Sequence, residues 1–246
     1  MLNKFVTTDN VKRTLAALDP LLGEMDKAIA QGRPPAVERG LTLLEGRTGT
    51  GKTEMGTWVA TQFEFVKYLR AAKLWSGAWM VEDFTLAAGL PVKGSAKANL
   101  RQLQEELRRR PRLFFLDEGD RVIPRQELLE TLRDIYDTTK SPIVIVSEGG
   151  GLTTINRKSP RTWRRLGQVV EYRTLSAADV QIVWEDLTEV KAPLSREQAE
   201  QILQHSQGGS FGEVMVTLAD LEQKLKANPG AGLTSKVLQM ALRRAV

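Results

Sequence analysis

Cysteine is absent from the 246 residues, which excludes disulfides, thiol catalysis and cysteine-ligated zinc or iron–sulfur sites. Histidine occurs once, at His205, in a polar helical stretch without a partner for a catalytic triad or a metal site. No apolar run reaches the length of about 18 residues that a membrane-spanning helix needs. Residues 1–7 lack the apolar segment of a signal peptide, so we expect a cytoplasmic protein with no membrane partner, bacterial or, if phage-encoded, in the host cytoplasm.

A phosphate-binding loop is the strongest pattern that the sequence does contain. Residues 46–53 have the spacing G-x-x-x-x-G-K-[ST] and follow the apolar run 41–45, while a helical stretch follows them. Backbone N–H groups of such a loop surround phosphates, Lys52 adds a positive charge, and the Thr53 hydroxyl binds Mg²⁺. The pattern therefore predicts ATP and Mg²⁺ as cofactors. The predicted contacts are Gly46, Thr48, Gly49, Thr50, Gly51, Lys52 and Thr53.

Two acidic residues close a second apolar run. Residues 113–116 read Leu-Phe-Phe-Leu and are followed by Asp117 and Glu118. Four consecutive apolar residues are typical of a buried parallel strand, whose carboxyl end lies at the ligand-binding edge of an open α/β sheet. We expect Asp117 to hold Mg²⁺ and Glu118 to polarise a water for attack on the γ-phosphate.

Strands alternate with helices over the first two thirds of the chain, which predicts an α/β fold with a five-stranded parallel sheet. The predicted strands are 40–45, 78–82, 112–116, 142–147 and 168–172, and the helices between them are 53–72, 97–110, 125–139 and 160–166. Helices alone are expected from Ser176 onward, at 176–188, 195–206, 210–227 and 233–244, with Ser176 and Ser195 as N-caps. The expected domains are a helical linker at 1–38, a nucleotide-binding core at 39–174 and a helical lid at 175–246.

Positive charge is concentrated in two windows, although the net charge of the chain is only +5. Residues 93–125 contain nine Lys/Arg and five Asp/Glu, and residues 157–173 contain six and one. Such clusters are expected for nucleic-acid binding, but they also collect at helix carboxyl ends, where they meet the helix dipole.

Three segments together resemble one family. The phosphate loop, the run 113–121 and above all residues 132–146, Leu-Arg-Asp-Ile-Tyr-Asp-Thr-Thr-Lys-Ser-Pro-Ile-Val-Ile-Val, resemble AAA+ ATPases of DNA transposition, the family of the Mu B and TnsC regulators. The likeness extends from about Phe5 to Val246. It implies a P-loop AAA+ core followed by a small all-helical lid domain.

The resemblance also implies roles for residues outside the loop. Ser147 occupies the position at which relatives place a side chain that senses the γ-phosphate, and Glu148 is an alternative because the local sequence departs from the family pattern. Arg164 or Arg165 occupies the position of an arginine finger that reaches the nucleotide of a neighbouring subunit. Glu213 replaces the arginine that relatives carry in the lid, so no role of that kind is assigned to it.

DNA contacts are implied in the loop 90–97, where Lys93 and Lys97 would neutralise phosphates and Ser95 would donate a hydrogen bond. The resemblance thus predicts an ATPase that forms a helical filament or ring on double-stranded DNA, without sequence preference, and recruits or activates a DDE transposase. One alternative is a helicase loader or replication-initiation ATPase acting on single-stranded DNA. A P-loop kinase for a small molecule is an alternative from another class.

Overall fold

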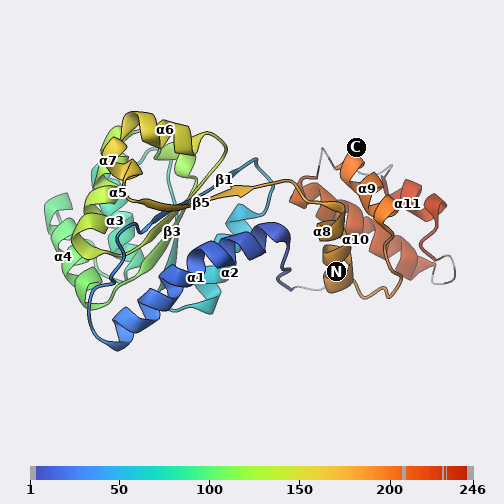
Figure 1. The fold of residues 1–246 in the computed structure, drawn as a ribbon, viewed down its shortest axis with the longest axis horizontal. Helices are drawn as coiled ribbons and strands as arrows, with labels where there is room; N and C mark the ends of the chain where they lie inside the picture. Colours follow the sequence, from blue (N-terminus) through green and yellow to red (C-terminus); the bar gives the residue numbers. More distant parts are fainter. Residues whose placement is uncertain (1–3, 207–208, 229, 231, 243–246) are drawn as a thin grey trace. The chain divides into compact units, whose positions relative to one another are not determined.

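The computed structural model describes residues 4–206, 209–228, 230 and 232–242. It consists of two compact units. The first, here called the core unit, comprises Thr14–Gly46 and Lys52–Glu171. The second, the helical unit, comprises Met1–Arg13, Arg47–Gly51 and Tyr172–Val246 (Figure 1).

Helices and strands follow one another along the whole chain. In order they are α1 (Asp9–Ala30), β1 (Leu41–Gly46), α2 (Lys52–Gln62), β2 (Val66–Arg70), α3 (Gly77–Ala87), α4 (Ala96–Arg109), β3 (Leu113–Asp117), η1 (Gly119–Arg121), α5 (Gln126–Thr139), β4 (Ile143–Ser147), α6 (Gly151–Lys158), α7 (Pro160–Trp163), β5 (Leu166–Tyr172), α8 (Ala177–Leu187), α9 (Arg196–His205), α10 (Phe211–Ala227) and α11 (Ser235–Leu242). The predicted end of the last helix, residues 243–244, lies outside the described residues.

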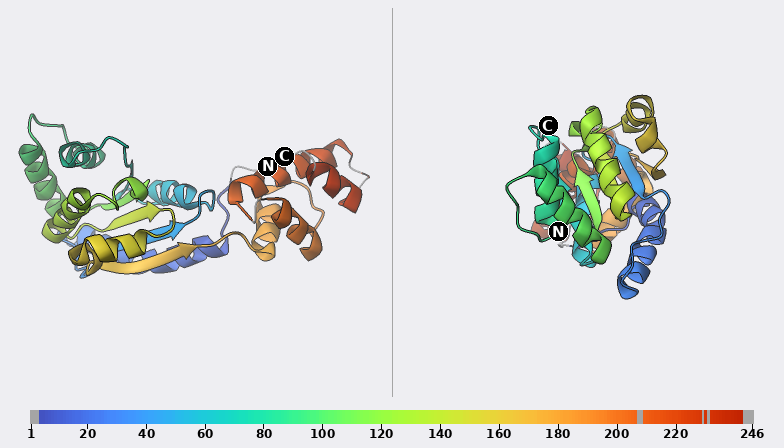
Figure 2. Two further views of the ribbon diagram at one scale, coloured as in Figure 1. Left: turned by 90° about the horizontal axis from the view of Figure 1, so that it is seen from above. Right: turned by 90° about the vertical axis from the view of Figure 1, so that its left-hand side faces the viewer.

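The core unit contains the predicted five-stranded parallel sheet, in the order β2-β3-β4-β1-β5. β1 pairs with β4, β4 with β3, and β3 with β2, all in parallel. Every residue of β3 and β4 is buried, as their apolar sequences predict, because helices cover both faces of the sheet (Figure 2). The carboxyl ends of β1, β3 and β4, at Gly46, Asp117 and Ser147, therefore share one edge of the sheet.

The second strand was predicted in the wrong place. Residues 78–82 belong to α3, which begins after Ser76, whose side chain caps the helix by accepting a hydrogen bond from the Trp79 N–H. The actual strand β2 lies inside the predicted helix 53–72, since α2 already ends at Gln62. Aromatic and β-branched residues dominate the stretch after Gln62, a composition that favours a strand.

The turn after β4 also differs from the prediction. The short helix α6 was not expected; it begins after Gly150, whose φ of +91° lies in the left-handed region. The predicted helix 160–166 is shorter than expected, because α7 ends at Trp163 and β5 already begins at Leu166.

The helical unit has its own apolar core, which confirms a helical region after the sheet. Ser176 and Ser195 begin α8 and α9 through reciprocal capping contacts with Asp179 and Gln198, so both predicted N-caps are confirmed. Trp184 is buried in this core, and its Nε1–H donates a hydrogen bond to the Ala192 carbonyl oxygen. Among the described helices of either unit, none is both long and apolar enough to span a bilayer.

Candidate nucleotide site

The phosphate loop joins the buried strand β1 to α2, as predicted. Gly49 and Gly51 have φ angles of +77° and +91°, a region that glycine adopts without the steric cost of a side chain. Lys52, the first residue of α2, is 8% exposed, and its Nζ donates to the Gly46 carbonyl oxygen over 2.5 Å. Burial lowers the pKa of Lys52. A partly desolvated ammonium group at the start of α2 is well placed to bind an anion.

The tip of this loop, Arg47–Gly51, belongs to the helical unit, where it contacts the start of α10. The backbone N–H of Phe211 donates to the Gly49 carbonyl oxygen over 2.7 Å. A Cβ atom at position 49 would come within 2.6 Å of the Ser210 Oγ, which could rotate away, so the φ angle is what requires glycine at this position.

Asp117 ends β3 and accepts three hydrogen bonds. Its Oδ2 accepts from the Thr53 hydroxyl at 2.8 Å and from the Tyr68 hydroxyl at 2.6 Å, while its Oδ1 accepts from the backbone N–H of Glu118 at 2.8 Å. The carboxylate is 6% exposed. The structure thus brings together Thr53 and Asp117, the two residues predicted to bind Mg²⁺, and both offer the oxygen ligands that this ion prefers.

Glu118 adopts a backbone conformation that is uncommon for a residue with a side chain. Its φ and ψ angles of +57° and +40° are left-handed, which costs about 1 kcal/mol or more for such a residue. Its carboxylate forms ion pairs with Arg70 at 2.6 Å and Arg121 at 3.3 Å. The hydrogen bond to Glu118 raises the pKa of Arg70. The predicted catalytic carboxylate is therefore held by two guanidinium groups in this structure.

Ser147 and Glu148, the two candidate phosphate sensors, differ in environment. Ser147 is buried at the end of β4, and its hydroxyl donates to the Glu148 carbonyl oxygen over 3.0 Å. Glu148 is exposed, and its backbone N–H donates to an Asp120 carboxylate oxygen. Its negative charge partly offsets the effect of burial, which still lowers the pKa of Lys52. Both residues stay candidates.

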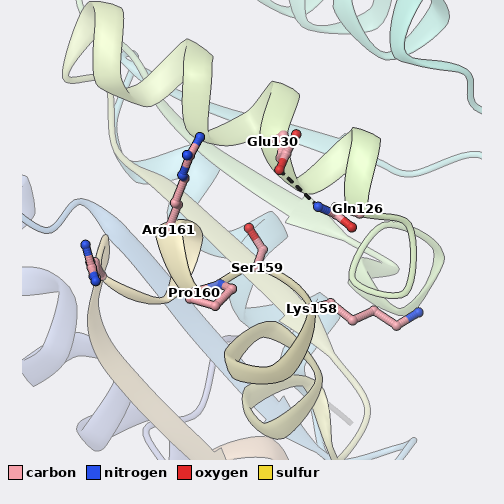
Figure 3. Close-up of a pocket in the computed structure, with 7 residues that line it drawn as sticks. Gln126, Glu130, Lys158, Ser159, Pro160 and Arg161 are labelled. Atoms are coloured by element: carbon pink, nitrogen blue, oxygen red, sulfur yellow. Dashed lines mark hydrogen bonds between the residues drawn. The ribbon is translucent and has the colours of Figure 1, made fainter.

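Arg164 and Arg165, the two candidate fingers, are distinguished by their contacts. Arg165 donates two hydrogen bonds to Asp137, at 2.8 and 3.0 Å, and this pairing raises its pKa. Arg164 lines two adjoining grooves between α5 and α7, with volumes of about 480 and 360 Å³. The first groove also contains Arg161, which points toward α5, and Lys158, whose Nζ donates to the Pro124 carbonyl oxygen over 2.7 Å (Figure 3). Within the part of the chain that the structure describes, neither groove is lined by the phosphate loop or the acid pair.

The predicted DNA-contacting residues lie where the connection after α3 enters α4: Lys93 and Ser95 precede the helix, and Lys97 is in its first turn. Lys93, Ser95 and Lys97 are all exposed. The buried Asn99 side chain accepts from the Lys93 backbone N–H at 2.6 Å and donates to the Lys93 carbonyl at 3.1 Å, and Ser95 caps α4. The backbone on both sides of Ser95 is thus fixed, while the side chains of Lys93 and Lys97 are exposed.

Sequence reasoning missed Tyr68 and Arg70, which contact the acid pair from β2. They are two residues apart on one strand, so their side chains share a face of the sheet. The prediction of a helix over residues 53–72 gives Tyr68 and Arg70 no shared face, so it does not place them together beside the acid pair. Arg121 was also missed, although its position three residues after Glu118 could have suggested a local ion pair.

The comparisons with known proteins agree with this fold. The sequence model described as "AAA domain" matches residues 36–155. No curated protein gives a significant match to the chain. Similar solved structures include the Aeropyrum pernix ORC2 protein (ADPNP–ADP complexes), with a TM-score of 0.69, 17% identity and coverage of 99% of this chain and 70% of that one.

Two further solved structures are similar. The Pyrobaculum aerophilum CDC6P structure has a TM-score of 0.72 at 17% identity and covers 100% of this chain and 70% of that chain. The Aeropyrum pernix ORC1 protein in complex with DNA has a TM-score of 0.59 at 18% identity, with coverage of 93% and 64%. The chain therefore has the AAA+ fold with a P-loop, and residues 36–155 match the model of an AAA domain.

Proposed function

We propose that this protein is an ATPase whose nucleotide state controls its assembly on DNA. The observation that carries the proposal is the convergence of Lys52, Thr53 and the acid pair at one edge of the sheet, where the Thr53 Oγ1 and Asp117 Oδ2 atoms are 2.8 Å apart. When bound, ATP with Mg²⁺ would supply a phosphoanhydride bond and a cation that offsets its charge.

Each residue of the site has a distinct task in this proposal. Lys52 would exchange its hydrogen bond with the Gly46 carbonyl for one with a phosphate oxygen. Thr53 and Asp117 would hold Mg²⁺ and its water shell. Glu118 would orient a water molecule and accept its proton, after at least one of its ion pairs with Arg70 and Arg121 opens.

DNA as the partner is supported by two independent features. The exposed Lys93, whose backbone is fixed by Asn99, and the exposed Lys97, in the first turn of α4, suit contacts with phosphates. One structure of similar fold, the ORC1 protein, was solved in complex with DNA. Among DNA-dependent roles, replication initiation or helicase loading is favoured by the similarity to ORC and CDC6 proteins.

Regulation of transposition is the second candidate, and the run 132–146 favours it. The two roles can be separated by measuring binding to double-stranded and single-stranded DNA by fluorescence anisotropy, each with ATP and with ADP. A helicase loader should prefer the single strand. A transposition regulator should prefer the duplex, and adding it should stimulate strand transfer by a DDE transposase. If single-stranded and double-stranded DNA bound equally well with ATP and with ADP, nucleotide state would not control DNA binding, which would contradict the proposed function.

Replacing Lys93 and Lys97 by alanine should weaken DNA binding to a similar extent for all sequences. Each lost phosphate contact should reduce the magnitude of the slope of log affinity against log salt concentration by about 0.9 on duplex DNA. The slope of the double variant should therefore be smaller in magnitude by about 1.8. Titrations at several salt concentrations measure this slope. Lys12→Ala, which removes an exposed lysine of α1, is a control for net charge. An unchanged slope in the double variant would remove this loop from the DNA interface.

The structure favours Arg164 over Arg165 as the residue that reaches a neighbouring subunit, because Arg165 is already paired with Asp137. Arg164→Ala should lower the ATPase rate of assembled protein by about 10³-fold, as expected for loss of an arginine finger. Mixing Arg164→Ala with Lys52→Ala subunits should restore part of the activity, since each variant supplies the group that the other lacks. If the mixture stays inactive, the residue does not act across an interface. Arg161→Ala, from the same groove, is the matched control.

A further inference from the structure

The edge strand β2 contributes a hydroxyl group to the candidate metal site. Tyr68 Oη donates to Asp117 Oδ2 over 2.6 Å, and the same oxygen accepts from Thr53 Oγ1 at 2.8 Å. Tyr68 is thus a donor to a carboxylate that is predicted to hold Mg²⁺.

Packing fixes the Tyr68 ring. Tyr68 pairs in register with Phe115 of β3, and its ring lies against Gly56 on α2, one turn after Thr53. A Cβ atom built on Gly56 would come within 2.9 Å of the Phe115 ring and 3.4 Å of the Tyr68 ring. Glycine at this position therefore makes room for the Phe115 ring, and the Tyr68 ring packs beside it at ordinary contact distance from α2, with its hydroxyl donating to Asp117.

The two donors to Asp117 Oδ2 have different tasks around a bound metal. The Thr53 hydroxyl can keep its hydrogen bond to Asp117 and offer a lone pair to Mg²⁺, because a hydroxyl has one donor hydrogen and two lone pairs. The Tyr68 hydroxyl is not predicted to bind the metal, so its hydrogen bond serves only to orient the Asp117 carboxylate. Outer hydrogen bonds of this kind orient ligands, and their loss typically weakens metal affinity about 10- to 100-fold.

We propose that Tyr68 is a positioning residue that holds the Asp117 carboxylate in the orientation needed for metal-dependent nucleotide binding. The inference rests on the proposed function. Tyr68 does not touch the reacting atoms; it acts through Asp117. Loss of the Tyr68 hydroxyl should therefore lower the affinity for the metal and leave the affinity for nucleotide without metal unchanged.

Tyr68→Phe tests the proposal, because it removes the hydroxyl and keeps the ring. Mn²⁺ binding at the site, measured as the Mn²⁺-dependent gain in affinity for a fluorescent ATP analogue because ATP alone already binds Mn²⁺ in solution, should weaken about 10-fold or more. ATP binding in EDTA, followed with a fluorescent ATP analogue, should stay unchanged. The matched control is Tyr136→Phe, which removes another buried tyrosine hydroxyl, bonded to the Val37 carbonyl oxygen at 2.6 Å. It should leave the Mn²⁺ affinity unchanged.

Wild-type Mn²⁺ affinity in the Tyr68→Phe variant would overturn the proposal and leave the proposed function intact. Equal losses in both phenylalanine variants would also overturn it, since they would indicate a general effect of lost hydroxyl groups. Should Tyr68→Phe fail to fold, Tyr68→Leu, which also removes the hydroxyl at this half-buried position, should weaken Mn²⁺ binding in the same way; normal binding there would refute the inference. Failure of the wild-type protein to bind Mn²⁺ with ATP would instead refute the proposed function.

Discussion

The Glu118→Gln variant should bind ATP as tightly as the wild-type protein and hydrolyse it about 10²- to 10⁴-fold more slowly, the usual contribution of a general base. Glutamine keeps the size of the side chain but cannot accept a proton from the attacking water. Single-turnover hydrolysis and equilibrium binding of a fluorescent ATP analogue measure the two effects separately. Because ATP would persist, the variant should also stay bound to DNA for longer.

Loss of the ion pairs is a separate consequence of this substitution. Glu118 pairs with Arg70 and Arg121, whose side chains are 66% and 37% exposed, and exposed pairs of this kind contribute at most about 1 kcal/mol. The variant should therefore remain folded. Glu64→Gln, in the exposed turn before β2, controls for the change in net charge. Hydrolysis at the wild-type rate by Glu118→Gln would remove this residue from the chemistry.

Lys52→Met should abolish the thermal stabilisation that ATP gives to the wild-type protein. A charge-assisted hydrogen bond is worth about 1.5–3 kcal/mol, so affinity should fall at least about 10- to 100-fold. Melting temperatures measured with and without ATP and Mg²⁺ give the result. An ATP-dependent shift of wild-type size would show that the phosphates bind elsewhere.

Without nucleotide, the same substitution should not destabilise the protein. Burial lowers the pKa of Lys52 in the folded state, so its charged form is disfavoured there relative to the unfolded chain. This unfavourable contribution is fully present below the folded-state pKa and is lost as the pH rises from the folded-state pKa to the unfolded-state pKa. At neutral pH the methionine variant should therefore be as stable as the wild-type protein or more stable. A large loss of stability would instead indicate a structural role for the ammonium group.

The phosphate loop and the acid pair could be predicted because their chemistry is set by local spacing. Gly49 and Gly51 are needed for their φ angles, and Asp117 follows an apolar run that can only be buried. The sheet order was not predicted. The edge strand β2 was misassigned because Lys67 and Arg70 interrupt its apolar residues, and only pairing with β3 settles its conformation.

Contacts between residues far apart in sequence could not be predicted in the same way. Arg164 and Arg165 are adjacent and chemically identical, yet only Arg165 is paired with Asp137, which lies on a different helix. The hydrogen bond from Tyr68 to Asp117 likewise joins two residues that lie on different strands and are 49 positions apart in the sequence. Such contacts depend on register and helix placement, which the single sequence does not specify.

The central claim is that nucleotide bound at the phosphate loop decides whether copies of this chain assemble on DNA. Electron microscopy of the protein with duplex DNA tests it most directly, with a non-hydrolysable ATP analogue in one sample and ADP in the other. The account predicts ordered oligomers on DNA with the analogue, and dispersed protein with ADP. The same appearance in both samples, whether assembled or monomeric, would contradict it.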